Sequence, residues 1–163
     1  MEDYKTGRID LSKSIEYHEK RTYFNRRYEK GLCYKNALSV LSKIALREKG
    51  VKAAGVIGYV LSENETKKVA VRHAWVKIYD RHSTEPLIVD VTMIADKTSI
   101  PTMLNCKYVE VEDFTYDEWF GLAVKNNGIP CIENLEGEKE ITEMLKKDGY
   151  IMLDEVKQHE EER

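Results

Sequence analysis

An amphipathic helix followed by short-linked strands is the pattern that most constrains the fold of this chain. Between residues 33 and 49, apolar side chains recur at intervals of three and four residues, which predicts a helix that buries one broad face. They are Ala37, Leu38, Val40, Leu41, Ile44, Ala45 and Leu46. Gly31 precedes this helix, and Gly50 follows it as the glycine that commonly ends a helix. Cys33 therefore falls in the first turn of the predicted helix.

Three strand-like segments follow this helix. Residues 51–61 are rich in valine and small side chains, residues 69–79 alternate, and residues 87–92 form a short β-branched run. The links between them are short and polar, which favours antiparallel neighbours. Gly55 and Gly58 lie within the first segment, where we interpret them as positions of close backbone packing. The pattern predicts an α+β fold in which the helix packs on a small antiparallel sheet.

The segments outside this core carry weaker patterns. We expect helices at residues 11–30, 116–125 and 138–147, a strand at residues 107–111, and a frayed, charged end at residues 154–163.

The length of the chain favours one domain. A sequence of 163 residues suffices for a single core and is short for two, and we find no internal repeat or linker. We therefore expect one domain over residues 1–163, with its core at about residues 25–95 and a C-terminal extension at residues 96–163.

Composition excludes several classes of protein. No apolar run approaches the roughly 18 residues that a membrane-spanning helix needs. The first residues are polar and mixed in charge, unlike a secretory signal, so we expect a cytoplasmic protein. The net charge of −3 argues against a nucleic-acid binder. Cys33, Cys106 and Cys131 are too widely spaced for a zinc site or a disulfide framework, and no nucleotide-binding motif is present. We expect neither a metal nor a cofactor.

One segment suits a different partner. Between residues 17 and 35, basic and aromatic side chains are interleaved, which is typical of surfaces that bind phosphates and stacked bases. They are Lys20, Arg21, Arg26, Arg27, Lys30 and Lys35, with Tyr17, Tyr23, Phe24, Tyr28 and Tyr34. We prefer to interpret this segment as a solvated helix face with buried tyrosines. In an enzyme, the same segment is a candidate for recognising an acidic part of the substrate.

His73 and Asp90 each interrupt an apolar strand-like segment, where an isolated polar group is unfavourable unless it has a partner. A hairpin that pairs Asp80 with Glu85 leaves residues 81–84 as the loop. In that register His73 and Asp90 become diagonal neighbours on one face, about 7–8 Å apart at Cα. A slip of one residue sends the two side chains to opposite faces.

These residue types have the chemistry of a catalytic thiol. Cysteine attacks a carbonyl as the thiolate, which a helix N-terminus and a nearby imidazole both favour. A carboxylate then holds the imidazole in the required tautomer and orientation. Taken singly, a cysteine in an apolar helix, such as Cys33, and a histidine in a strand, such as His73, are more often structural residues of the core. The ordered set of Cys33, His73 and Asp90 favours a catalytic triad, and we interpret Cys106 and Cys131 as structural.

Three short segments carry a family resemblance: Gly-Leu-Cys-Tyr-Lys-Asn-Ala-Leu at 31–38, Arg-His-Ala-Trp-Val at 72–76 and Val-Asp-Val-Thr at 89–92. Together they closely resemble the transglutaminase-like core of the cysteine-protease superfamily, over about residues 25–95. The His-Ala-Trp-Val segment is also similar to that of the B-type leader peptidases of lasso-peptide maturation. The papain-type Cys-Gly-Ser-Cys-Trp signature is absent, and His73 follows Cys33 by only 40 residues, which favours the compact transglutaminase arrangement.

The resemblance implies a papain/transglutaminase-like core that cleaves or transfers amide bonds of a peptide or protein substrate. Cys33 forms a thioester, His73 acts as base and then as acid, and Asp90 orients His73. Water or an amine then accepts the acyl group, and the sequence leaves both open. The alternative is a catalytically inactive domain of the same fold that binds a peptide or protein.

The resemblance also implies an oxyanion hole, comprising the Cys33 N–H and one upstream side chain. Tyr28 and Asn25 are the candidates, because no glutamine precedes Cys33. Trp75 shares the predicted face of His73, where it either walls the thiol or packs in the core; we favour packing.

Overall fold

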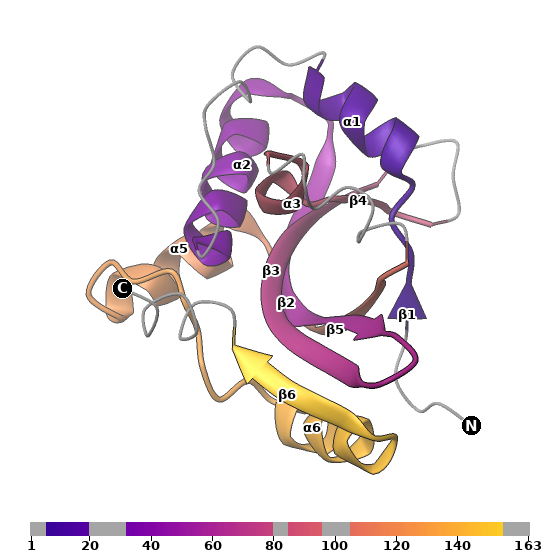
Figure 1. Cartoon of the computed structure of the whole chain (residues 1–163). Helices are drawn as coiled ribbons and strands as arrows, with labels where there is room; N and C mark the ends of the chain where they lie inside the picture. The colour runs from indigo at the N-terminus through magenta and orange to yellow at the C-terminus, as the bar shows by residue number, and fades with distance from the viewer. Residues whose placement is uncertain (1–5, 20–31, 80–84, 96–104, 155–163) are drawn as a thin grey trace.

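The computed structural model describes residues 6–19, 32–79, 85–95 and 105–154 (Figure 1). These residues form an α+β fold with a six-stranded mixed sheet and five helices. The strands are β1 (Thr6–Gly7), β2 (Lys52–Glu63), β3 (Lys68–Tyr79), β4 (Leu87–Val89), β5 (Lys107–Phe114) and β6 (Tyr150–Asp154). The helices are α1 (Leu11–Glu19), α2 (Cys33–Arg47), α3 (Val91–Ala95), α5 (Tyr116–Lys125) and α6 (Glu138–Lys147). None of the helices in the described ranges is long and apolar enough to cross a membrane.

The strands lie in the order β1-β5-β2-β3-β4, and β6 adds to β3. β2 pairs with β3 along the full length of both strands, so β4 and β6 share the other edge of β3. β4 pairs there with Val76–Ile78, and β6 with Lys68–Arg72. In the described part of the chain, residues 73–75 are therefore left without a strand partner on that edge.

The expectation of a purely antiparallel sheet is wrong, because β6 runs parallel to β3. β6 follows α6 through a turn at Gly149, which has a φ of 95°. The sequence pattern does not indicate this strand.

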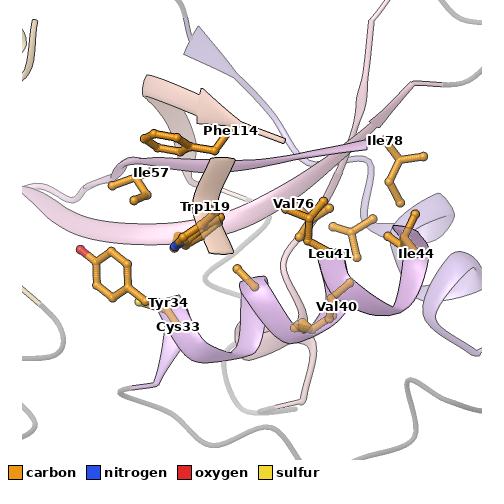
Figure 2. Packing of buried hydrophobic residues seen from close by; sticks show 14 residues of the cluster. Cys33, Tyr34, Val40, Leu41, Ile44, Ile57, Val76, Ile78, Phe114 and Trp119 are labelled. Atoms are coloured by element: carbon orange, nitrogen blue, oxygen red, sulfur yellow. The ribbon is translucent and has the colours of Figure 1, made fainter. Parts of the chain in front are cut away.

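The predicted central helix is confirmed as α2. Its buried face, including Val40, Leu41 and Ile44, packs against Val76 and Ile78 of the sheet in the main core (Figure 2). The helix ends two residues earlier than predicted, and Gly50 follows with a φ of 83°.

The other predicted elements fall close to their expected positions. The helices predicted at residues 116–125 and 138–147 are confirmed as α5 and α6, and the strand predicted at residues 107–111 is confirmed and extends to Phe114. α1 confirms the first part of the helix predicted at residues 11–30; residues 20–30 lie outside the described residues, as does most of the predicted frayed end.

The register of the β3–β4 hairpin is the predicted one. Val76 pairs with Val89 and Ile78 with Leu87, the register in which Asp80 would face Glu85. The prediction that this strand reaches Thr92 is wrong, because β4 ends at Val89. Asp90 instead caps the N-terminus of α3: its Oδ1 accepts a hydrogen bond from the Met93 N–H at 3.2 Å. Aspartate is among the preferred residues at a helix N-terminus, and this local preference prevails over the β-branched pattern.

Two glycines of β2 allow close packing, as predicted. A Cβ at Gly55 would lie 2.1 Å from the Trp119 ring of α5, and a Cβ at Gly58 would lie 2.0 Å from the carbonyl oxygen of Val109 in β5. The pairing of β2 with β5 shifts register between Ile57 and Gly58, the irregularity that bends and twists a sheet.

We predict opposite effects for two Gly→Ala substitutions. Gly58→Ala places a methyl group against the backbone of β5 and should lower the free energy of unfolding by about 1–3 kcal/mol or more. Gly121→Ala, within α5, has no atom within 4 Å of the new Cβ and should raise the free energy of unfolding by about 0.5–1 kcal/mol. Urea unfolding measures both, and equal effects would contradict the packing described here.

Candidate active site

The sequence-predicted triad residues come from three elements that meet at the gap in the edge of β3. Cys33 is the first residue of α2, His73 lies in the gap, and Asp90 lies between β4 and α3. α2 and α3 are joined directly, because Asn36 Nδ2 donates a buried hydrogen bond to Thr92 Oγ1 at 2.9 Å.

His73 and Asp90 form a buried hydrogen bond. His73 Nε2 lies 2.8 Å from Asp90 Oδ2, and both side chains are 1% exposed. A buried carboxylate and a buried imidazole are each costly alone, so this contact explains why two polar groups interrupt apolar segments of the sequence. The hairpin register predicted from the sequence places His73 and Asp90 on the same side, and the structure brings them into contact.

Cys33 is the second partner of the His73 ring. Burial by itself lowers the pKa of His73, but the charges of Asp90 and Cys33, and the hydrogen bonds to both, outweigh burial and hold this pKa well above its ordinary value. A raised histidine pKa favours the imidazolium, which is the form that pairs with a thiolate. Asp90 occupies Nε2, so Nδ1 is the ring nitrogen that a thiolate at Cys33 would have to face.

The N-terminus of α2 has no side-chain cap. Leu32 occupies the capping position and cannot accept a hydrogen bond through its side chain. The first N–H groups of the helix therefore present their partial positive charge beside Cys33 without competition from a cap. The Cys33 side chain itself is buried, with a relative exposure of 0%.

Three further residues were predicted to line the site. Tyr28 and Asn25 lie outside the described residues. Trp75 is 3% exposed; its ring stacks on His73 with centroids 6.2 Å apart and meets the Tyr108 ring edge-on at 4.9 Å. Trp75 therefore packs between a triad residue and β5.

Cys106 and Cys131 are free thiols, as is Cys33. Burial and the charge of Asp90 raise the pKa of the Cys106 thiol, and His73 lowers it, so Cys106 lies close to the buried pair. Burial raises the pKa of Cys131, whose sulfur is 3.9 Å from Arg72 Nη1. In the described part of the chain, no His, Cys, Asp and Glu side chains are grouped so that they could hold a metal ion.

Arg72 builds a second buried network on the opposite face of β3. Its guanidinium donates to the Tyr34 hydroxyl at 2.6 Å, to the Ile132 carbonyl at 2.6 Å and to Glu138 Oε1 at 2.7 Å. Burial raises the Glu138 pKa, but hydrogen bonds and charge from Arg72 outweigh it and lower this pKa overall. The network joins α2, β3 and the start of α6 next to the triad.

Sequence reasoning missed Tyr108, which donates a hydrogen bond to Asp90 Oδ2 at 2.9 Å. Its strand was predicted, but the contact joins β5 to the end of β4, which β2 and β3 separate in the sheet. The role of Arg72 was also missed, although a lone arginine beside His73 in an apolar strand is a signal that could have been used.

Comparison with known proteins finds no match among family models, curated proteins or solved structures. The site is therefore interpreted from its own geometry.

We predict that His73 makes stability depend on pH with a defined sign. Its folded-state pKa is raised above 6.5, so the stability it contributes is fully present below that pH and is lost as the pH rises through the folded-state pKa. The difference in unfolding free energy between the wild type and His73→Gln should be largest at about pH 5.5–6.5 and should shrink toward about pH 9. Urea unfolding in the Cys33→Ser background removes titration of the thiol, and a difference independent of pH would contradict the prediction.

Proposed function

We propose that this protein is a thiol-dependent enzyme of the transglutaminase-like type, which hydrolyses or transfers amide bonds of a peptide or protein substrate. The observation that carries the proposal is the buried hydrogen bond between His73 and the Asp90 carboxylate, with Cys33 close enough to raise the pKa of the His73 ring. The order of elements agrees: Cys33 opens a helix, and His73 and Asp90 come from adjacent antiparallel strands or their end.

The first half of the reaction forms a thioester. The Cys33 thiolate attacks the amide carbonyl, and the new oxyanion is stabilised by the Cys33 N–H at the uncapped start of α2. As the tetrahedral intermediate collapses, the His73 imidazolium gives its proton to the leaving amine, and the C–N bond breaks. Asp90 keeps the ring oriented throughout.

The second half releases the acyl group. Neutral His73 takes a proton from the acceptor, the acceptor attacks the thioester carbonyl, and the C–S bond breaks to regenerate Cys33. Water as the acceptor makes the protein a protease or amidase, and an amine makes it a transglutaminase. Three cysteines that form no disulfide suit a reducing compartment, and we propose a cytoplasmic location.

The complete burial of Cys33 favours a second candidate function. A transglutaminase-like domain whose thiol stays covered would bind a peptide or protein without cleaving it, and His73 and Asp90 would then serve the fold alone.

Competitive alkylation distinguishes the two functions. The three thiols are labelled with a haloacetamide between about pH 5 and about pH 9 and read separately by peptide mass spectrometry; activated thiols ionise at about pH 3.5–7.5 and ordinary ones near 8.5. We expect Cys33 to react at least about tenfold faster than Cys106 at about pH 6, although both are buried.

His73→Ala should remove this preference, while His73→Gln tests the same loss with a side chain of similar size. Cys106 is the matched control in every sample, because its burial resembles that of Cys33. If Cys33 remains as inert as Cys106 in the folded wild type, the enzyme is excluded and the binding function stands.

A further inference from the structure

The Asp90 carboxylate has donors from three elements. His73 Nε2 and the Tyr108 hydroxyl both contact Oδ2, at 2.8 and 2.9 Å, and the Met93 N–H contacts Oδ1 at 3.2 Å. Tyr108 therefore bonds the same oxygen that holds the His73 ring. Tyr108, His73 and Asp90 are all buried.

The bend of the sheet brings Tyr108 to this oxygen. Tyr108 lies on β5 opposite Val60 of β2, and His73 lies on β3 opposite Gly58, so the two side chains share a face of the sheet. Gly58 places no side chain between them, and the register shift beside it curves β5 toward the end of β4.

Packing fixes the Tyr108 ring independently of its hydroxyl. The ring meets Trp75 edge-on at 4.9 Å and an interplanar angle of 78°. Trp75 and Tyr108 also line a cavity of about 270 Å³, together with Lys77 and Glu110, so they form a wall between this cavity and the buried pair. Removing only the hydroxyl keeps that wall in place.

A buried tyrosine hydroxyl needs some acceptor, and most acceptors would satisfy it. The acceptor here is the ionisable oxygen that orients the imidazole. A donor to a carboxylate stabilises its charged form and draws electron density away from its other hydrogen bonds. The strength of the His73–Asp90 contact therefore depends on Tyr108.

We propose that Tyr108 is a positioning residue of the triad: its hydroxyl fixes the Asp90 carboxylate and limits how strongly that carboxylate holds the His73 proton. The catalytic consequence rests on the proposed function. Within the described ranges, the titratable groups that face the ring are Asp90 after β4, Cys33 on α2, Cys106 just before β5 and Tyr108 in β5.

The proton affinity of His73 tests this role directly. NMR of ¹⁵N-histidine-labelled protein follows the ring during a pH titration, and His73→Gln assigns its signal among the four histidines. In Tyr108→Phe, Asp90 loses the hydrogen bond from the tyrosine hydroxyl and interacts more strongly with the imidazolium. The His73 pKa should therefore rise by roughly 0.5–1 unit. Tyr59→Phe is the matched control: Tyr59 is also buried in the sheet, but its hydroxyl bonds Glu138 and Thr142, so His73 should be unchanged.

A substitution in the opposite direction covers the case in which Tyr108→Phe does not fold. Site-specific 3-fluorotyrosine at position 108 keeps the hydroxyl and makes it a stronger donor, and it should lower the His73 pKa. A His73 pKa that moves in neither folded variant overturns the proposal, since a purely structural hydroxyl would change stability alone. The titration needs no substrate and no reactive thiol. An inert Cys33 would therefore end the proposed enzyme function without deciding the role of Tyr108.

Discussion

The interruption in the edge of β3 is the constraint on which the site depends. β6 pairs with this edge up to Arg72 and β4 pairs with it from Val76, so no strand in the described ranges pairs with residues 73–75 there. A continuous neighbouring strand would place its backbone where Asp90 and the start of α2 now meet His73. The two flanking strands, β4 and β6, come from distant parts of the chain (Figure 1). The site therefore needs both strands in place along β3.

Two buried networks then fix α2 against β3. Successive strand residues point to opposite faces, so Arg72 and His73 each organise a separate network. The first residue of α2, Cys33, contacts His73, and the second, Tyr34, contacts Arg72. Buried charges are costly when unpaired, and removing one partner typically costs about 3–5 kcal/mol. Contacts of α2 with both faces of β3 therefore oppose sliding and rotation of the helix. This keeps the Cys33 thiol beside the His73 imidazole.

Local rules predicted part of this arrangement. The shared face of His73 and Asp90 could be worked out, because side chains alternate along strands and the hairpin loop is short. The end of β4 could not be worked out, because the β-branched run favours a strand whereas Asp90 favours the start of a helix, and the sequence does not show which preference prevails. β6 depends on pairing with a strand far earlier in the chain, and the Tyr108 contact depends on a bend at Gly58. Contacts of this kind leave no periodic signal in the sequence.

Pre-steady-state kinetics with p-nitrophenyl acetate show whether Cys33 becomes acylated and is then released, as we propose. A catalytic Cys33 should give a burst of p-nitrophenolate equal to the enzyme concentration, followed by slower turnover. The burst should be absent in Cys33→Ala and strongly slowed in His73→Ala. It should be less affected in Asp90→Ala, in which the ring is retained but no longer oriented. If the wild type releases p-nitrophenolate no faster than Cys33→Ala does, Cys33 is not a catalytic thiol and the protein is a binding domain.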